Sequence, residues 1–384
     1  MKKSLIALTA AALAVTMMAS AQDKKLTACF TYIGPIGDVG WTFAHNDGRL
    51  LAEKAVPGVE TKYVESVPEG NALPTIDRLV SQGCKLIFTT SFGYMDQTLE
   101  AAKKYPDVIF AHASGFKRAP NMLTYMADFY EVYYLNGMMA GALSKTGKLG
   151  YVAAFPIPEL KRHISAYALG ARAVNPKAVV NVKWINAWFD PAKAKEAAEA
   201  LMSEGNDILA FTEDTATVVQ VAGKKGVPSF GHYNPMYKFA PDTVISGQIV
   251  HWEKIYADIF RKVLSGAYTS KNLQDVDYWW LLKDKAVELG ADDNLLINPK
   301  FVDALKKATM KVGTKTMSVY DRIVALNTNL SRAKPTFHPF TGPIRDRKGI
   351  LRIPAGRSAS VLELNTMGWV APGVAGEVAD EPSK

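Results

Sequence analysis

The sequence is poor in the residues that build metal-binding and disulfide-rich domains, because its 384 residues include 2 cysteines and 6 histidines. It contains no C-x-x-C pair, no H-E-x-x-H motif and no G-x-S-x-G turn. Those spacings are typical of thiol redox sites, zinc proteases and serine hydrolases, respectively. Their absence argues against these enzyme classes, and we expect a non-enzymatic protein without catalytic residues, metal or cofactor.

Long apolar runs are also scarce, and the one of note lies at the start of the chain. Met-Lys-Lys precedes an apolar stretch over 5–18, and Ala-Ser-Ala follows it before Gln22. This order is typical of a secretory signal peptide, here over 1–21. A membrane anchor is the alternative, but the stretch is shorter than the roughly 20 residues that span a bilayer. No cysteine stands at the cleavage point, so we expect a periplasmic protein without a lipid anchor.

Cys29 and Cys84 each lie beside a strand-like segment. In an oxidising compartment they could form one bridge, or both could be buried thiols, and the sequence leaves the two interpretations open.

The chain also lacks a block of basic residues. Its 45 Lys and Arg exceed its 37 Asp and Glu and give a net charge of +8, but they are dispersed and no RNA-binding aromatic motif accompanies them. Dispersed charge of this kind is typical of solvated helix faces. We therefore expect no nucleic-acid partner.

Short β-rich runs alternate with amphipathic segments through most of the chain. The first cycle has predicted strands at 26–33, 61–65, 85–90 and 108–112, with helices over 41–55, 72–82 and 95–105. The second cycle has strands at 149–155, 179–185, 207–211 and 227–231, with helices over 159–174, 191–204 and 215–225. Strands separated by such helices form parallel sheets. The sequence therefore predicts an α/β fold with two doubly wound parallel-sheet lobes.

The chain beyond the second cycle predicts a hinge with several crossings. Another strand, helix and strand follow at 244–250, 251–264 and 277–283, which suggests that the chain passes back between the lobes. We assign lobe 1 to 22–143 and about 250–275, and lobe 2 to 144–249 and about 276–334. For 335–384 we expect a turn-linked hairpin and a tail that is disordered beyond Gly373.

The loops at the strand ends carry the candidate binding residues, since ligands of open α/β sheets bind beyond the carboxyl ends of strands. The loop over 34–42 has three glycines, a planar ring at Trp41 and a carboxylate at Asp38, which either caps the next helix or accepts a ligand N–H. Its glycine spacing differs from the dinucleotide pattern G-x-G-x-x-G.

Aromatic and acidic residues recur in loop after loop, although each one alone is equally consistent with packing between helix and sheet. We therefore predict a pocket that stacks a planar ring between the lobes while carboxylates accept its N–H groups. The candidate ligand-binding residues are Asp38, Trp41, Phe92, Tyr94, Asp128, Phe155, Trp188, Glu213, Asp214, His232 and Trp252. His232 and His251 lie on separate loops without ligand spacing, which disfavours a metal site.

These residues resemble the basic membrane protein family of periplasmic solute-binding proteins. The resemblance covers about 26–282 and rests on five segments: Gly37–Trp41 where the family usually has Asp-x-Ser-Phe, Phe88–Tyr94, Tyr134–Gly141, Trp188–Pro191 and the Gly-Asn-Asp-Ile-Leu segment at Gly205. Better known members bind purine nucleosides and deliver them to an ABC permease. The tail segment Phe340–Asp346 is similar to an extension found in some members.

The resemblance implies two doubly wound lobes joined by three crossings, with Trp41 as the ring that stacks on the base and Asp38 as the polar group beside it. Acidic residues grip the ribose in that family, but here Thr212-Glu213-Asp214 and His232-Tyr233-Asn234 depart from its pattern. We therefore expect a smaller ligand such as a purine base, captured by hinge closure for an ABC permease in the inner membrane. The alternatives are a nucleoside binder, a sensor subunit of a signalling receptor, a nucleoside hydrolase, and a sugar or amino-acid binder.

Overall fold

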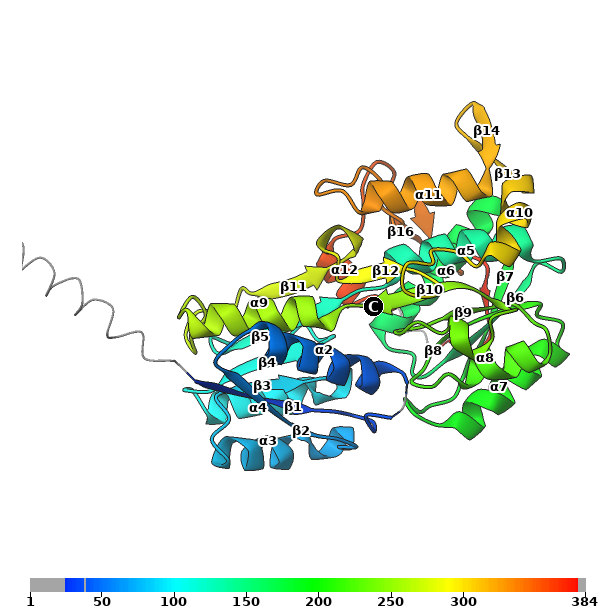
Figure 1. The fold of residues 1–384 in the computed structure, drawn as a ribbon. Helices are drawn as coiled ribbons and strands as arrows, with labels where there is room; N and C mark the ends of the chain where they lie inside the picture. Colours follow the sequence, from blue (N-terminus) through cyan, green and yellow to red (C-terminus); the bar gives the residue numbers. More distant parts are fainter. Residues whose placement is uncertain (1–24, 38, 379–384) are drawn as a thin grey trace, which may run out of the picture.

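The computed structural model describes residues 25–37 and 39–378 (Figure 1). The expected signal peptide over 1–21 and the candidate residue Asp38 lie outside the described residues. No helix of the described ranges combines the length and the hydrophobicity that crossing a membrane requires.

A six-stranded parallel sheet forms lobe 1, in the order β11-β5-β4-β3-β1-β2. Its strands are β1 (Leu26–Thr31), β2 (Val59–Val64), β3 (Leu86–Thr89), β4 (Ile109–Ala113), β5 (Met122–Ala127) and β11 (Asp277–Trp280). Helices α2 (Trp41–Ala55) and α9 (Trp252–Leu264) pack together, as do α3 (Ala72–Ser81) and α4 (Met95–Lys104). Every residue of β3, β4 and β5 is buried, as expected for parallel strands covered by helices on both faces.

A seven-stranded sheet forms lobe 2, in the order β12-β10-β9-β8-β6-β7-β17. Its strands are β6 (Lys148–Ala153), β7 (Val179–Trp184), β8 (Ile208–Thr212), β9 (Ser229–Gly231), β10 (Val244–Val250), β12 (Val287–Leu289) and β17 (Val374–Ala375). They pair in parallel except for β12, which runs antiparallel to β10. The helices are α5 (Tyr130–Leu143), α6 (Pro158–Val174), α7 (Pro191–Ser203) and α8 (Thr217–Lys224). The predicted fold class, two parallel-sheet α/β lobes, is confirmed.

The chain passes between the sheets after β5, after β10 and after β11, so three crossings join the lobes. Two segments differ from the expected boundaries. Helix α5 belongs with lobe 2, because it crosses α6 so closely that the backbone of Tyr167 leaves no room for a Cβ at Gly137. Strand β11 belongs to the sheet of lobe 1, because it is hydrogen-bonded to β5.

The C-terminal region extends along lobe 2. Helices α10 (Pro299–Lys307) and α11 (Val319–Leu330) pack on α5, with the hairpin β13 (Thr309–Val312) and β14 (Lys315–Ser318) between them. The expected hairpin follows as β15 (Ile344–Arg345) and β16 (Leu351–Ile353), and α12 (Val361–Asn365) then packs on α6. The expectation of disorder beyond Gly373 is wrong for 374–378, because β17 pairs with the edge strand β7.

A disulfide joins Cys29 in β1 to Cys84 just before β3. Both cysteines are buried, at 0% and 1% exposure, among side chains that α3 and α4 cover. Of the two interpretations that the sequence left open, the structure shows the bridge.

The double substitution Cys29→Ala/Cys84→Ala should lower the free energy of unfolding by about 2–4 kcal/mol, because the bridge closes a loop across 55 residues and restricts the unfolded chain. Urea denaturation of the oxidised protein, the reduced protein and the variant measures this. The reduced wild type should unfold like the variant, and equal midpoints for all three samples would contradict the prediction.

Candidate ligand-binding site

A narrow pocket lies between the lobes at the carboxyl ends of their strands. About 260 Å³ is free of atoms there, but only about 10 Å³ admits the centre of a water-sized sphere. That is roughly the room of one water molecule, so a planar ring enters only when the walls move apart. Lobe 1 contributes Ile33, Trp41, Ser91, Phe92 and Ser114, and lobe 2 contributes Glu159, Trp188 and Tyr233.

Trp41 begins α2 and is held from several sides. Its indole N–H donates to the carbonyl of Thr90 at 2.5 Å. The rings of His45, Tyr233 and Trp252 meet it edge-on, with centroids 4.4, 5.4 and 5.2 Å away. Edge-to-face pairs of this kind fix a ring's orientation. Trp41 is therefore a wall of the pocket whose orientation is fixed by its neighbours.

Trp188 closes the pocket from lobe 2. Its indole N–H donates to Glu69 Oε1 of lobe 1 at 3.3 Å. The same oxygen accepts from Ser91 Oγ at 2.6 Å and from the backbone N–H of Gly93 at 3.1 Å. Because Ser91 and Phe92 also line the pocket, this carboxylate organises the lobe 1 wall and ties it to lobe 2.

Two further contacts join the lobes around the pocket. Ser114 Oγ of lobe 1 donates to Glu159 Oε2 of lobe 2. Asn234 Nδ2 of lobe 2 donates to the carbonyls of Val39 and Gly40 at 3.0 Å. At Gly40 a Cβ would lie 2.5 Å from the backbone of Asp214, so only glycine allows this approach. The structure is thus a closed form of the two lobes.

Five of the predicted site residues form or support the pocket walls. Trp41, Phe92 and Trp188 line it directly. The half-buried Phe155 packs behind Trp188, with ring centroids 5.2 Å apart. Trp252 is fully buried behind Trp41 and stacks on His45 at 4.2 Å.

Three other predicted residues are buried without lining the pocket. Tyr94 donates from its hydroxyl to the carbonyl of Val67 at 2.5 Å. Glu213 Oε1 accepts from Thr215 Oγ1 at 3.1 Å. The backbone N–H of Asp214 donates to the carbonyl of Trp188 at 2.8 Å, which positions the Trp188 loop.

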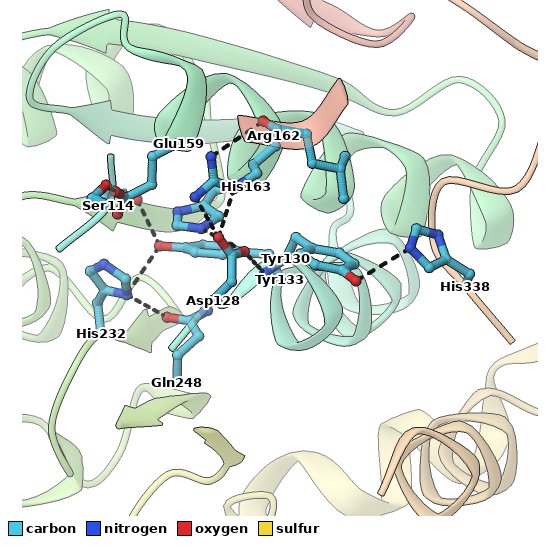
Figure 2. Close-up of polar contacts among 12 residues, drawn as sticks. Ser114, Asp128, Tyr130, Tyr133, Glu159, Arg162, His163, His232, Gln248 and His338 are labelled. Atoms are coloured by element: carbon cyan, nitrogen blue, oxygen red, sulfur yellow. Dashed lines mark hydrogen bonds and ion pairs between the residues drawn. The ribbon is translucent and has the colours of Figure 1, made fainter. Parts of the chain in front are cut away.

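Asp128 and His232 each belong to a group of buried polar residues near the hinge (Figure 2). Asp128 Oδ2 accepts from Arg162 Nε at 2.7 Å, and Oδ1 accepts from the backbone N–H of Tyr130 at 3.0 Å. Burial alone would raise the pKa of Asp128, but Arg162 and His163 hold it well below its ordinary value of 3.8. Asp128 is therefore a buried carboxylate committed to Arg162.

His232 lies beside Tyr133 and Gln248. Its Nδ1 lies 3.2 Å from Tyr133 Oη and 2.9 Å from Gln248 Oε1. Burial lowers the pKa of His232 well below 6.5, so the ring is neutral at physiological pH. Among the described residues no cluster of His, Cys, Asp or Glu has the arrangement of a metal site.

Sequence reasoning missed several lining residues, of which Tyr233 and Glu159 are the largest. Tyr233 follows the predicted His232 and has a left-handed backbone, with φ of 64°. The ring of Tyr233 lines the pocket, whereas the ring of His232 does not. Glu159 lies in the first turn of α6, where an acidic residue also serves the helix dipole. Because an acidic residue at this position is usually explained by the helix dipole, the sequence pattern does not indicate that Glu159 lines the pocket.

Residues 25–322 match the family described as ABC transporter substrate-binding protein, PnrA-like. The chain is 39% identical over 354 residues to a purine-binding protein of Brucella abortus, covering 92% of this chain and 93% of that protein. It is 37% identical over 259 residues to a protein of Haloferax volcanii named as a candidate glucose-binding protein of an ABC transporter, covering 67% of this chain and 65% of that protein.

A solved structure of a solute-binding protein of an ABC transporter from Aeropyrum pernix superposes with a TM-score of 0.64 at 17% identity. The superposition covers 80% of this chain and 91% of that chain. At this identity the likeness concerns the fold, and it agrees with the two parallel-sheet lobes described above.

Asp128→Asn should lower the free energy of unfolding by about 3–5 kcal/mol, because it leaves the buried Arg162 guanidinium without its counter-charge. The pKa of Asp128 is lower in the folded than in the unfolded chain. Its contribution is therefore present above pH 3.8 and is lost as the pH falls through the folded-state pKa. Urea denaturation at pH 7 measures the loss.

Asp242→Asn is the matched control, because Asp242 forms an exposed ion pair with Lys300. Its unfolding midpoint should stay at the wild-type value, as is usual for surface pairs. A small effect for Asp128→Asn, equal to that of the control, would mean that the hinge pair contributes little to stability.

Proposed function

The chain belongs to the PnrA-like family of ABC transporter substrate-binding proteins, and we propose that it captures a purine base or a related planar nitrogen heterocycle by closing its lobes. Members of this family bind small molecules and work with a membrane permease; the family consists of binding proteins rather than enzymes. We place the protein in the periplasm, exported by the signal peptide that residues 1–21 predict.

One observation carries the proposal: four rings from both lobes, Trp41 and Phe92 against Trp188 and Tyr233, line a single narrow pocket. Planar rings gain from stacking on aromatic faces in addition to their area burial. The 39% identity to a purine-binding protein over nearly the whole chain supports the same ligand class. The bulk of Trp188 in the pocket wall favours a free base over a nucleoside, whose ribose needs additional room.

Glucose is the second candidate, because the Haloferax volcanii relative is named for it. A sugar also stacks on aromatic rings and donates hydroxyl hydrogens to carboxylates. A sensor subunit would bind the same ligand with the same fold, so identifying the ligand comes first.

A calorimetric screen of the mature protein should therefore show binding of purine bases, weaker binding of nucleosides and no binding of glucose. A ligand at about 100 times its Kd adds roughly 2.7 kcal/mol to stability, so a thermal-shift assay gives an independent reading. Binding of glucose with no response to any purine would overturn the purine assignment in favour of a sugar.

Trp41→Ala should weaken binding of the base by about 1–3 kcal/mol, which is the usual loss when the aromatic partner of a nucleobase is removed. Titration calorimetry measures the change. Trp184→Ala is the control, since Trp184 lies outside the pocket and donates its indole N–H to the carbonyl of Glu377. Affinities within about threefold for Trp41→Ala and wild type would exclude Trp41 as the stacking ring.

A further inference from the structure

The pocket wall contains one charged side chain, Glu159, among the lining residues that the structure describes. Ile33 and the four rings are apolar or aromatic, and the two serines contribute hydroxyl groups. The hydroxyl of Ser91 is already donated to Glu69. The recognition of polar ring atoms therefore falls mainly on Glu159 and its neighbour Ser114.

Glu159 is positioned for this by both lobes. It lies in the first turn of α6 and is 4% exposed. Its Oε2 accepts from Ser114 Oγ across the cleft, which fixes the plane of the carboxylate. In the described part of the chain no side chain or backbone group donates to Oε1, so this oxygen is the acceptor left for a ligand.

Among the described residues, the carboxylates predicted from the sequence are placed elsewhere. Asp128 is committed to Arg162 at the hinge. Glu213 and Asp214 are fully buried and are not among the residues that line the pocket. Glu159, which the sequence did not single out, is thus the carboxylate that faces the ligand space.

An ionised carboxylate accepts hydrogen bonds and donates none. A ring edge with an amino group supplies the missing donor, whereas a carbonyl oxygen at the same position repels the carboxylate and leaves both acceptors unsatisfied. Buried acceptors without donors are unfavourable, and a site built to receive a donor discriminates strongly against an analogue that lacks it.

We infer that Glu159 determines the specificity of the pocket and selects amino-substituted planar rings over analogues that carry only an oxygen acceptor at the same ring edge. This inference rests on the proposed function and narrows it to rings of the 6-aminopurine type. Ser114 is a positioning residue, because it orients the carboxylate from the opposite lobe as the cleft closes.

The test compares adenine with 6-methoxypurine, which carries an ether oxygen in place of the amino group and no N–H at N1, by titration calorimetry at pH 7.4. The wild type should prefer adenine by about tenfold or more. Glu159→Gln keeps the shape of the side chain but adds an N–H donor that can pair with the methoxy oxygen. The preference for adenine should then fall by about tenfold or more.

Two variants complete the design. Ser114→Ala should keep the preference but weaken the binding of adenine, because the carboxylate remains and loses the hydroxyl that orients it. Glu199→Gln, on the exposed face of α7, should bind as wild type does. Thermal denaturation verifies that each variant is folded, and Glu159→Asp, which keeps the charge, should retain the preference if Glu159→Gln unfolds. Equal selectivity in Glu159→Gln and wild type would overturn the inference alone, whereas a wild type that binds no purine would overturn the proposed function with it.

Discussion

Asp128 and Arg162 form the ion pair on which the arrangement of the two lobes depends. Asp128 lies at the first crossing, directly after β5, while Arg162 extends from α6 of lobe 2. The guanidinium lies 5.0 Å from the ring of Trp279 in β11 and donates to the carbonyl of Leu364 in α12 at 3.3 Å. One buried charge pair thus joins a crossing, a strand of lobe 1 and the C-terminal extension. Buried charges need several partners of this kind, because moving each charge out of water has a large desolvation penalty.

The two lobes contribute to the pocket in different ways. Lobe 1 fixes Trp41 largely by itself, through Thr90, His45 and Trp252, so the stacking wall is ready before closure. Lobe 2 then adds Trp188 and Tyr233, whose positions relative to Trp41 depend on how the hinge sets the two sheets. A preset wall on one lobe reduces the conformational entropy lost on binding, since only the second lobe must move.

Periodicity and turn chemistry predicted the two-lobe fold and the end of the sheets where the pocket lies, since strand spacing and strand-end loops are local properties of the chain. They identified Trp41, Phe92 and Trp188 among the lining residues for the same reason.

Asp128 and His232 also follow strands, yet they serve the hinge, because Arg162, Tyr133 and Gln248 approach them from distant segments. Glu159 and Tyr233 were missed because which side chain faces the cleft depends on the relative orientation of the lobes. The family resemblance, now confirmed, added the three crossings, but it did not reveal that α5 belongs with lobe 2.

Around the pocket, the described residues make few polar contacts across the cleft: Trp188 with Glu69, Glu159 with Ser114, and Asn234 with the backbone of Val39 and Gly40. Each such hydrogen bond has a net value of only about 0.5–1.5 kcal/mol, because water satisfies the same groups when the cleft opens. Opening the cleft is therefore inexpensive without a ligand. Under the proposed function, a bound ring would shift the balance only through contacts that exist in the closed form alone, namely those with Trp188, Tyr233 and Glu159 of lobe 2. In this proposal specificity and closure depend on the same residues, so a ring that Glu159 rejects would also fail to hold the lobes together.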